Sequence, residues 1–156
     1  MPRKRLKILS LLVIFGIIAI LSSKGESFAA DDTLYEKISP KELISIIESE
    51  GDSAFESGDN VVIWSINDQM AALKISDNND NVVFLYYNSN LKPTPAKINK
   101  WNSQKMYSKS FQDTTGDVFL ELDLDFAGGI TEANVKNFLR ICYTSLDSFS
   151  QINNSD

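Results

Sequence analysis

Apolar and acidic residues alternate without a break between positions 120 and 126 of the chain. An alternation of period two is typical of a β-strand with one buried side and one solvent-facing side. We therefore predict a strand over residues 118–126, which Gly128 and Gly129 connect to a helix that begins near Thr131. The apolar side carries Leu120, Leu122, Leu124 and Phe126, and the wet side carries Glu121, Asp123 and Asp125.

Three segments instead repeat their apolar residues every three or four positions, which is typical of helices packed against a core. The first begins with Ser39 before a proline, as an N-cap does, and ends at Gly51. The second begins in the same way, with Thr94 before a proline. The third runs from Thr131 to about position 149 along a stripe of Val135, Phe138, Leu139, Cys142, Leu146 and Phe149.

Between these helices, β-branched and aromatic residues mark short strands that are separated by turns rich in Asn, Asp and Gly. Their regular spacing is that of an antiparallel meander. The order helix, strands, helix, two-stranded hairpin, helix predicts one α+β domain over residues 39–150, with helices packed on an antiparallel sheet. The predicted strands are residues 53–57, 61–66, 71–76, 82–87, 106–112 and 118–126.

The N-terminal segment has the layout of an export signal. Four basic residues lie within the first seven positions, and an uncharged apolar run follows over residues 8–21. Small residues at Ser27 and Ala29 suit cleavage after Ala29. The run is 14 residues long, about 21 Å of helix against a hydrocarbon core of ~30 Å. We therefore favour a signal peptide over residues 1–29, with an uncleaved N-terminal membrane anchor as the alternative.

The remaining chain is acidic and lacks the usual catalytic and metal-binding residues. Residues 31–156 hold 10 basic and 20 acidic residues, a formal net charge of −10, which disfavours nucleic acid as a partner. There is no histidine, and a single cysteine excludes an intramolecular disulfide and a Cys-rich zinc site. We expect Cys142 to be a core thiol. We predict no catalytic residue, metal or cofactor, and therefore no enzyme.

The acidic side of the strand at 118–126 is the first candidate for a binding surface. Glu121, Asp123 and Asp125 can present an electronegative stripe to a cationic partner, or a site for a hard cation. The simpler interpretation is a solvated strand face that resists aggregation. We expect Lys105 and Lys109, on the preceding strand, to supply paired charges.

The second candidate is an aromatic contact at Tyr86 and Tyr87. Successive residues of a strand point to opposite faces, so one of the two tyrosines is expected to be exposed. An exposed tyrosine is a common element of protein interfaces, although many have no function.

Four parts of the chain carry a resemblance to a known family. They are Ser39-Pro40-Lys41-Glu42-Leu43-Ile44 with Glu50-Gly51, Ile98-Asn99-Lys100-Trp101-Asn102, Gly116-Asp117-Val118-Phe119-Leu120-Glu121-Leu122-Asp123-Leu124, and Ala127-Gly128-Gly129-Ile130-Thr131. Together these segments resemble the YbjN family, whose members are named as bacterial sensory-transduction regulators. The resemblance covers residues 39–150 and implies a fold like that of type III secretion chaperones, in the order α-β-β-β-α-β-β-α, often as a dimer. It brings no catalytic residues, and the N-terminal export signal departs from the family pattern.

These observations favour a non-enzymatic, exported binding or regulatory module that holds a protein or peptide partner on a sheet face or edge. The alternative is a structural, homodimeric envelope protein without a separate ligand. The domain is expected to be periplasmic or secreted, or else membrane-anchored through its N-terminal segment and facing the periplasm. Residues 30–38 form a polar lead-in to the domain, and residues 151–156 form a polar tail.

Overall fold

The computed structural model describes residues 34–153. The predicted signal peptide or anchor, the cleavage site and residues 30–33 of the polar lead-in lie outside the described residues. The chain divides into two units, Met1–Asp31 and Asp32–Asp156. Every helix and strand described below belongs to the second unit.

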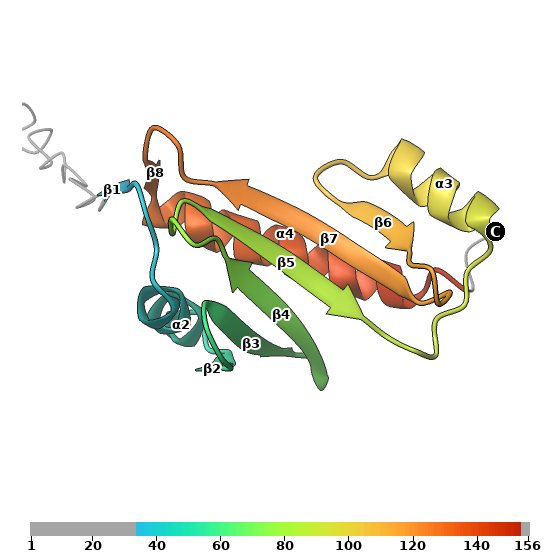
Figure 1. The fold of residues 1–156 in the computed structure, drawn as a ribbon, viewed down its shortest axis with the longest axis horizontal. Helices are drawn as coiled ribbons and strands as arrows, with labels where there is room; N and C mark the ends of the chain where they lie inside the picture. Colours follow the sequence, from blue (N-terminus) through green and yellow to red (C-terminus); the bar gives the residue numbers. More distant parts are fainter. Residues whose placement is uncertain (1–33, 154–156) are drawn as a thin grey trace, which may run out of the picture. The chain divides into compact units, whose positions relative to one another are not determined.

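The second unit is built on one antiparallel sheet, which confirms the predicted α+β class (Figure 1). Its six strands lie in the order β2-β3-β4-β5-β7-β6. The strands that pair are neighbours in sequence except where β7 inserts between β5 and β6. The strands are β2 (Ser53–Glu56), β3 (Val61–Ile66), β4 (Gln69–Ile75), β5 (Asn81–Tyr87), β6 (Lys109–Gln112) and β7 (Val118–Asp125).

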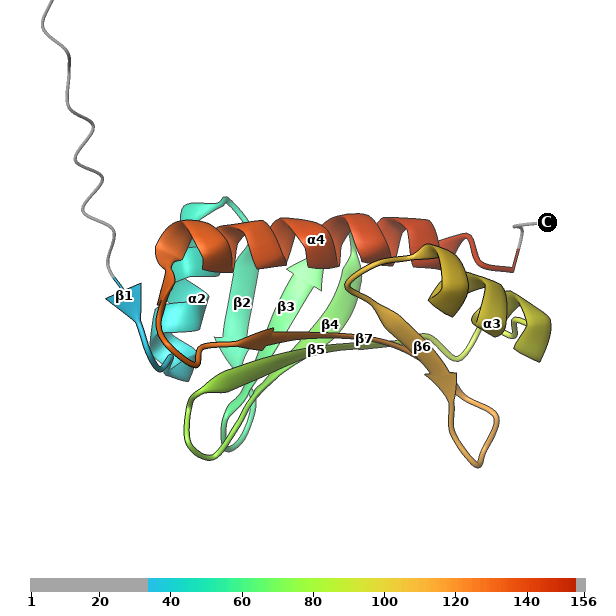
Figure 2. The same ribbon diagram turned by 90° about the horizontal axis from the view of Figure 1, so that it is seen from above.

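Three helices complete the fold, namely α2 (Pro40–Ser49), α3 (Pro95–Gln104) and α4 (Glu132–Ser150). α4 lies along one face of the sheet, α2 packs beside it, and α3 lies at the β6 end (Figure 2). The predicted helix starts are confirmed, because Ser39, Thr94 and Thr131 are the N-caps of α2, α3 and α4. Ser39 and Glu42 form the predicted capping box.

The core fills the space between the sheet and α4. Phe149, in the last turn of α4, meets Trp101 of α3 edge to face at a centroid distance of 5.1 Å. It also meets Tyr86 of β5 at 6.4 Å. Such perpendicular aromatic pairs contribute about 0.5–1.5 kcal/mol beyond their buried area. Phe149 therefore joins α3, α4 and the sheet at one point.

The predicted strand over residues 106–112 is wrong in its first half. β6 begins only at Lys109, and Lys105 is the C-cap of α3. The φ angle of Tyr107 is +68°, which turns the backbone out of an extended conformation between the helix and the strand. Lys105 therefore does not lie on the strand beside β7, as its predicted pairing with the acidic residues required.

Two further short strands form a separate, two-stranded sheet. β1 (Leu34–Tyr35) pairs antiparallel with β8 (Ile130–Thr131). Residues 34 and 35 of the predicted polar lead-in are therefore part of a strand pair. Two-residue strands have no periodicity to detect in a sequence. Gly129 precedes β8 with a φ of +82°, and a Cβ atom added there would lie 2.8 Å from Cδ2 of Leu34.

We predict that Gly129→Ala destabilises the protein more than Gly128→Ala. Both glycines have a φ of +82°, where alanine costs about 1–2 kcal/mol, but only at Gly129 does the added Cβ meet another residue. Urea denaturation measures the free energy of unfolding of each variant. Combining Gly129→Ala with Leu34→Ala should remove the difference. Equal losses for the two single variants would contradict the close approach of β1 to Gly129.

Candidate functional site

The sheet face opposite α2 and α4 has no helix over it in the described part of the chain (Figure 2). We call this surface the outer face. Along β3 and β5, fully buried residues alternate with half-buried ones, and the latter point to the outer face. The strand register sets its central row across all six strands, which is Phe55, Ile63, Ala72, Leu85, Glu121 and Lys109.

The central row is apolar over four strands and ends in an ion pair. Nζ of Lys109 lies 2.5 Å from Oε1 of Glu121, and this hydrogen bond raises the pKa of Lys109 above its ordinary value. On the opposite margin, Phe55 exposes 53% of its surface. The outer face therefore has an apolar centre and, on β7 and β6, a charged border.

An aromatic stack lies beside the central row. The ring of Tyr87 stacks on that of Phe119 at 5.2 Å, and Phe119 stacks on Phe111 at 5.3 Å. The three rings come from β5, β7 and β6, whose register places them in adjacent positions. Met70 of β4 belongs to the same side of the sheet and is 51% exposed.

The two tyrosines point to opposite sides of β5, as the sequence predicts. Tyr86 is buried in the core, where its hydroxyl donates to Oε1 of Gln69 and accepts from Nδ2 of Asn88. Tyr87 is 43% exposed on the outer face. Of this pair, Tyr87 is the residue that can touch a partner.

The three acidic residues of β7 share the outer face but have different surroundings. Glu121 is paired with Lys109. Asp123 is exposed and lies opposite Val83 of β5. Asp125 accepts a hydrogen bond of 2.8 Å from the backbone amide of Ala127, so it stabilises the turn after the strand. No group of three acidic, Cys or His residues able to hold a metal ion occurs among the residues described.

The predicted pairing of Lys105 with these acids is wrong, because Lys105 ends α3 instead of lying on β6. Its Nζ atom lies over the ring of Trp101, 5.2 Å from the centroid. Lys109 alone of the two lysines forms the expected ion pair.

The two edges of the sheet differ in their access to a further strand. At the β6 edge, the amide of Ser110 donates to Oδ1 of Asn102 at 2.8 Å, and Nδ2 of Asn102 donates to the carbonyl oxygen of Ser110 at 2.9 Å. The side chain of Asn102 thus occupies the backbone groups that an added strand would use. β2 forms the opposite edge, and among the described residues it pairs with β3 alone.

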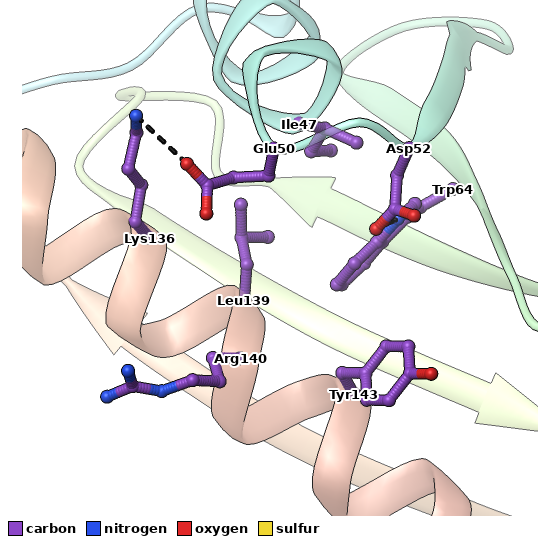
Figure 3. Close-up of a pocket in the computed structure, with 8 residues that line it drawn as sticks. All are labelled: Ile47, Glu50, Asp52, Trp64, Lys136, Leu139, Arg140 and Tyr143. Atoms are coloured by element: carbon purple, nitrogen blue, oxygen red, sulfur yellow. Dashed lines mark hydrogen bonds and ion pairs between the residues drawn. The ribbon is translucent and has the colours of Figure 1, made fainter.

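A cleft of about 260 Å³ opens on the helix side of the sheet, between α2 and α4 (Figure 3). The ammonium of Lys136 lies 3.0 Å from Glu50 and 3.1 Å from Glu132, and these contacts raise its pKa above the usual value. The indole of Trp64 donates to Asp52 at 3.1 Å. The lining residues are Ile47, Glu50, Asp52, Trp64, Lys136, Leu139, Arg140 and Tyr143.

Sequence reasoning missed this cleft, because its residues come from distant parts of the chain and follow no motif. Several of its polar groups are already bonded: Lys136 to Glu50, Trp64 to Asp52, and the hydroxyl of Tyr143 to Asn67, which lies outside the lining, at 2.9 Å. The cleft holds no pair of a nucleophile and a base among these lining residues. Its volume can admit a small molecule.

The family model of YbjN, described as "Putative bacterial sensory transduction regulator", matches residues 40–151. The chain belongs to the YbjN family. This confirms the resemblance seen in the sequence, and the description of the family fits a regulatory role. No curated protein matches the chain. Within the part of the chain that the structure describes, no helix has the length and apolar character needed to cross a membrane.

Replacing Asn102 with alanine should destabilise this YbjN domain by about 1–3 kcal/mol, because the buried amide and carbonyl of Ser110 lose their partner. Asn99→Ala is the matched control on the exposed side of α3, where a change within about 0.5 kcal/mol is expected. Chemical denaturation measures the free energy of unfolding of both variants. Equal stability of both variants would show that Asn102 does not hold the β6 edge.

Cys142 lies in the core, as expected from its position in the α4 stripe. Burial raises the pKa of its thiol well above the ordinary value, so the reactive thiolate is scarce near neutral pH. We predict that a thiol reagent at about pH 8 leaves native Cys142 unmodified and reacts once the chain is unfolded in urea. Rapid reaction of the native protein, at the rate of an added exposed cysteine at position 106, would contradict this placement.

Proposed function

We propose that this YbjN-family domain is an exported, non-enzymatic binding module that holds a protein or peptide partner on the outer face. The observation that carries the proposal is the central row, which crosses six strands, is apolar over four of them and has no helix over it in the described residues. Apolar side chains on a sheet face normally belong under a second layer. A partner supplies that layer here.

The composition of the outer face supports a protein partner over a small molecule. An apolar, aromatic centre with a charged border is the usual anatomy of a protein interface. The stack of Tyr87, Phe119 and Phe111 offers flat, rigid contact area. The pair of Lys109 and Glu121, with Asp123 beyond it, offers charges at the border that favour one orientation of the partner.

The size of the outer face favours a peptide or a single element of a larger partner. Six strands at ~4.8 Å spacing span about 24 Å, and strands of this length extend about 20 Å. The resulting area, about 500 Å², is smaller than the ~800 Å² that each partner buries in a standard interface. Because Asn102 closes the β6 edge, the proposed contact uses the face more than that edge.

The second candidate is a structural homodimer in the cell envelope, in which two copies cover one another's outer faces. The observation that favours it is that the outer face carries both signs of charge, with Lys74 beside Val83 and Asp123 on the next strand. A surface with both signs can pair with itself around a two-fold axis. Export in either case follows from the N-terminal sequence pattern.

The test is site-specific photo-cross-linking of the full chain in the cells that produce it. A photoreactive residue replaces Tyr87 on the outer face, and in a control chain it replaces Glu48, which is exposed on α2. We expect one cross-linked product with another protein from position 87 and none from position 48. A product with a second copy of the chain would select the homodimer instead.

A matched pair of substitutions decides whether the product depends on the outer face. Met70→Lys places a charge on the outer face, whereas Met106→Lys makes the same change at an exposed site away from it. Met70→Lys should reduce the yield about tenfold, the effect of ~1.4 kcal/mol in binding, with Met106→Lys unchanged. Equal yields from both variants, or no product from position 87, would refute the binding module.

A further inference from the structure

The positive charges of the acidic domain are concentrated in one stretch. Residues 81–112 contain five lysines and no acidic residue, although residues 31–156 hold 20 acidic residues in all. All five lysines lie between positions 92 and 109, on α3 and its two flanks. The molecule therefore has a basic end at α3, beside β6 and at the opposite edge of the sheet from β2 (Figure 1).

Lys92 pairs with Asp117, and Lys109 pairs with Glu121. Three further lysines line one hollow of about 240 Å³ between α3 and the C-terminal end of α4, together with Trp101. Nζ of Lys97 donates to the carbonyl oxygen of Asn153 at 2.7 Å. These three are Lys97, Lys100 and Lys105.

An apolar tip follows Lys105 directly. Met106 and Tyr107 are 74% and 71% exposed, the highest values among the large apolar residues of the described chain. Neither side chain belongs to the buried core, and neither lies on the outer face. The tip thus presents two apolar side chains to solvent between Lys105 and Lys109.

Trp101 holds the tip at both ends. Its carbonyl oxygen accepts a hydrogen bond of 2.9 Å from the amide of Lys105, and its indole Nε1 donates to Oγ of Ser108 at 3.1 Å. Tyr107, between these anchor points, has a φ of +68°, which is uncommon for an aromatic residue. The exposed tip is therefore a fixed turn with both of its ends bonded to a buried tryptophan.

We propose that this end of the domain docks on a membrane surface that contains anionic phospholipids. Met106 and Tyr107 enter the boundary between headgroups and acyl chains, where an amphipathic tyrosine is favoured. Lys97, Lys100 and Lys105 face the lipid phosphates, to which clustered lysines are attracted. The acidic residues elsewhere act weakly at this end, because salt screens charges over about 8–10 Å.

A membrane fits the tip better than a second protein does. A protein interface needs a broad matching surface, ~800 Å² on each side, which a two-residue tip cannot supply. Lipids instead rearrange around a small apolar tip. The contact is weak when it acts alone, since stable attachment takes two signals. The N-terminal apolar segment, if retained, provides the other signal. Docking through this tip does not depend on a partner at the outer face.

The experiment places a fluorophore at position 106 of the full chain by Met106→Cys. Cys142 is buried and does not compete for the label. The chain is reconstituted in vesicles of phosphatidylethanolamine and phosphatidylglycerol, or of phosphatidylcholine alone, which contain lipids with a quencher at the headgroup boundary. A control chain carries the fluorophore through Phe55→Cys, at the exposed β2 edge.

We expect a blue shift and strong quenching of the probe at position 106 on the phosphatidylglycerol vesicles, and neither on phosphatidylcholine. The probe at position 55 should show neither effect on either vesicle. Most of the quenching should be lost at about 1 M salt, where the screening length falls to ~3 Å.

Charge-reversal variants test the lysines. Lys100→Glu with Lys105→Glu should abolish the quenching at position 106, whereas Lys37→Glu with Lys41→Glu, the same change in net charge on and before α2, should leave it intact. Circular dichroism checks that both variants remain folded. A probe at position 106 that stays in water, or one quenched equally at position 55 or on phosphatidylcholine, would overturn the proposal. Loss of quenching in the chain with Lys37→Glu and Lys41→Glu would also overturn the proposal, as would binding of an acidic protein in place of lipid.

Discussion

The structure depends on the burial of one sheet face beneath α4. The apolar stripe of α4 covers the inner side chains of the central strands, and Phe149 joins the helix to Tyr86 and Trp101. α2 packs on the same side, and α3 lies at the β6 edge. The fold therefore has two layers, and the opposite face of the sheet is left to solvent or to a partner. That asymmetry leads to the proposed function.

The covered side of the molecule could be predicted from the sequence, because it follows from local periodicity. The alternation around Leu122 and the stripe through Val135 each identify a buried side without knowledge of the neighbouring elements. The same reasoning extended β6 too far, to position 106. A strand needs a partner to pair with, and the positive φ of Tyr107 ends the extended conformation. The pairing of Leu34 with Thr131 joins segments that are distant in sequence, and no local pattern indicates it.

The candidate site was only partly predictable, for a similar reason. Alternation indicated that Tyr86 and Tyr87 face opposite sides, but not which of them is buried. The row from Phe55 to Lys109 depends on the register of six strands, which the sequence of one strand does not contain. The sequence predicted that the acidic residues share one face. It did not predict that Asp125 would accept a hydrogen bond from the amide of Ala127 in the turn after the strand. The role of Asn102 at the β6 edge depends on its position relative to Ser110 in space.

The most direct measurement of the central claim is the rate at which Met70 is oxidised by peroxide in intact cells and in the purified full chain. Met70 lies on the outer face and is 51% exposed when nothing covers it. Oxidation of a methionine follows its exposure. If a partner protein covers the outer face, Met70 is oxidised much more slowly in the cell than in the purified chain. Equal rates in the two settings would show that the cell supplies no such partner, and would contradict the account.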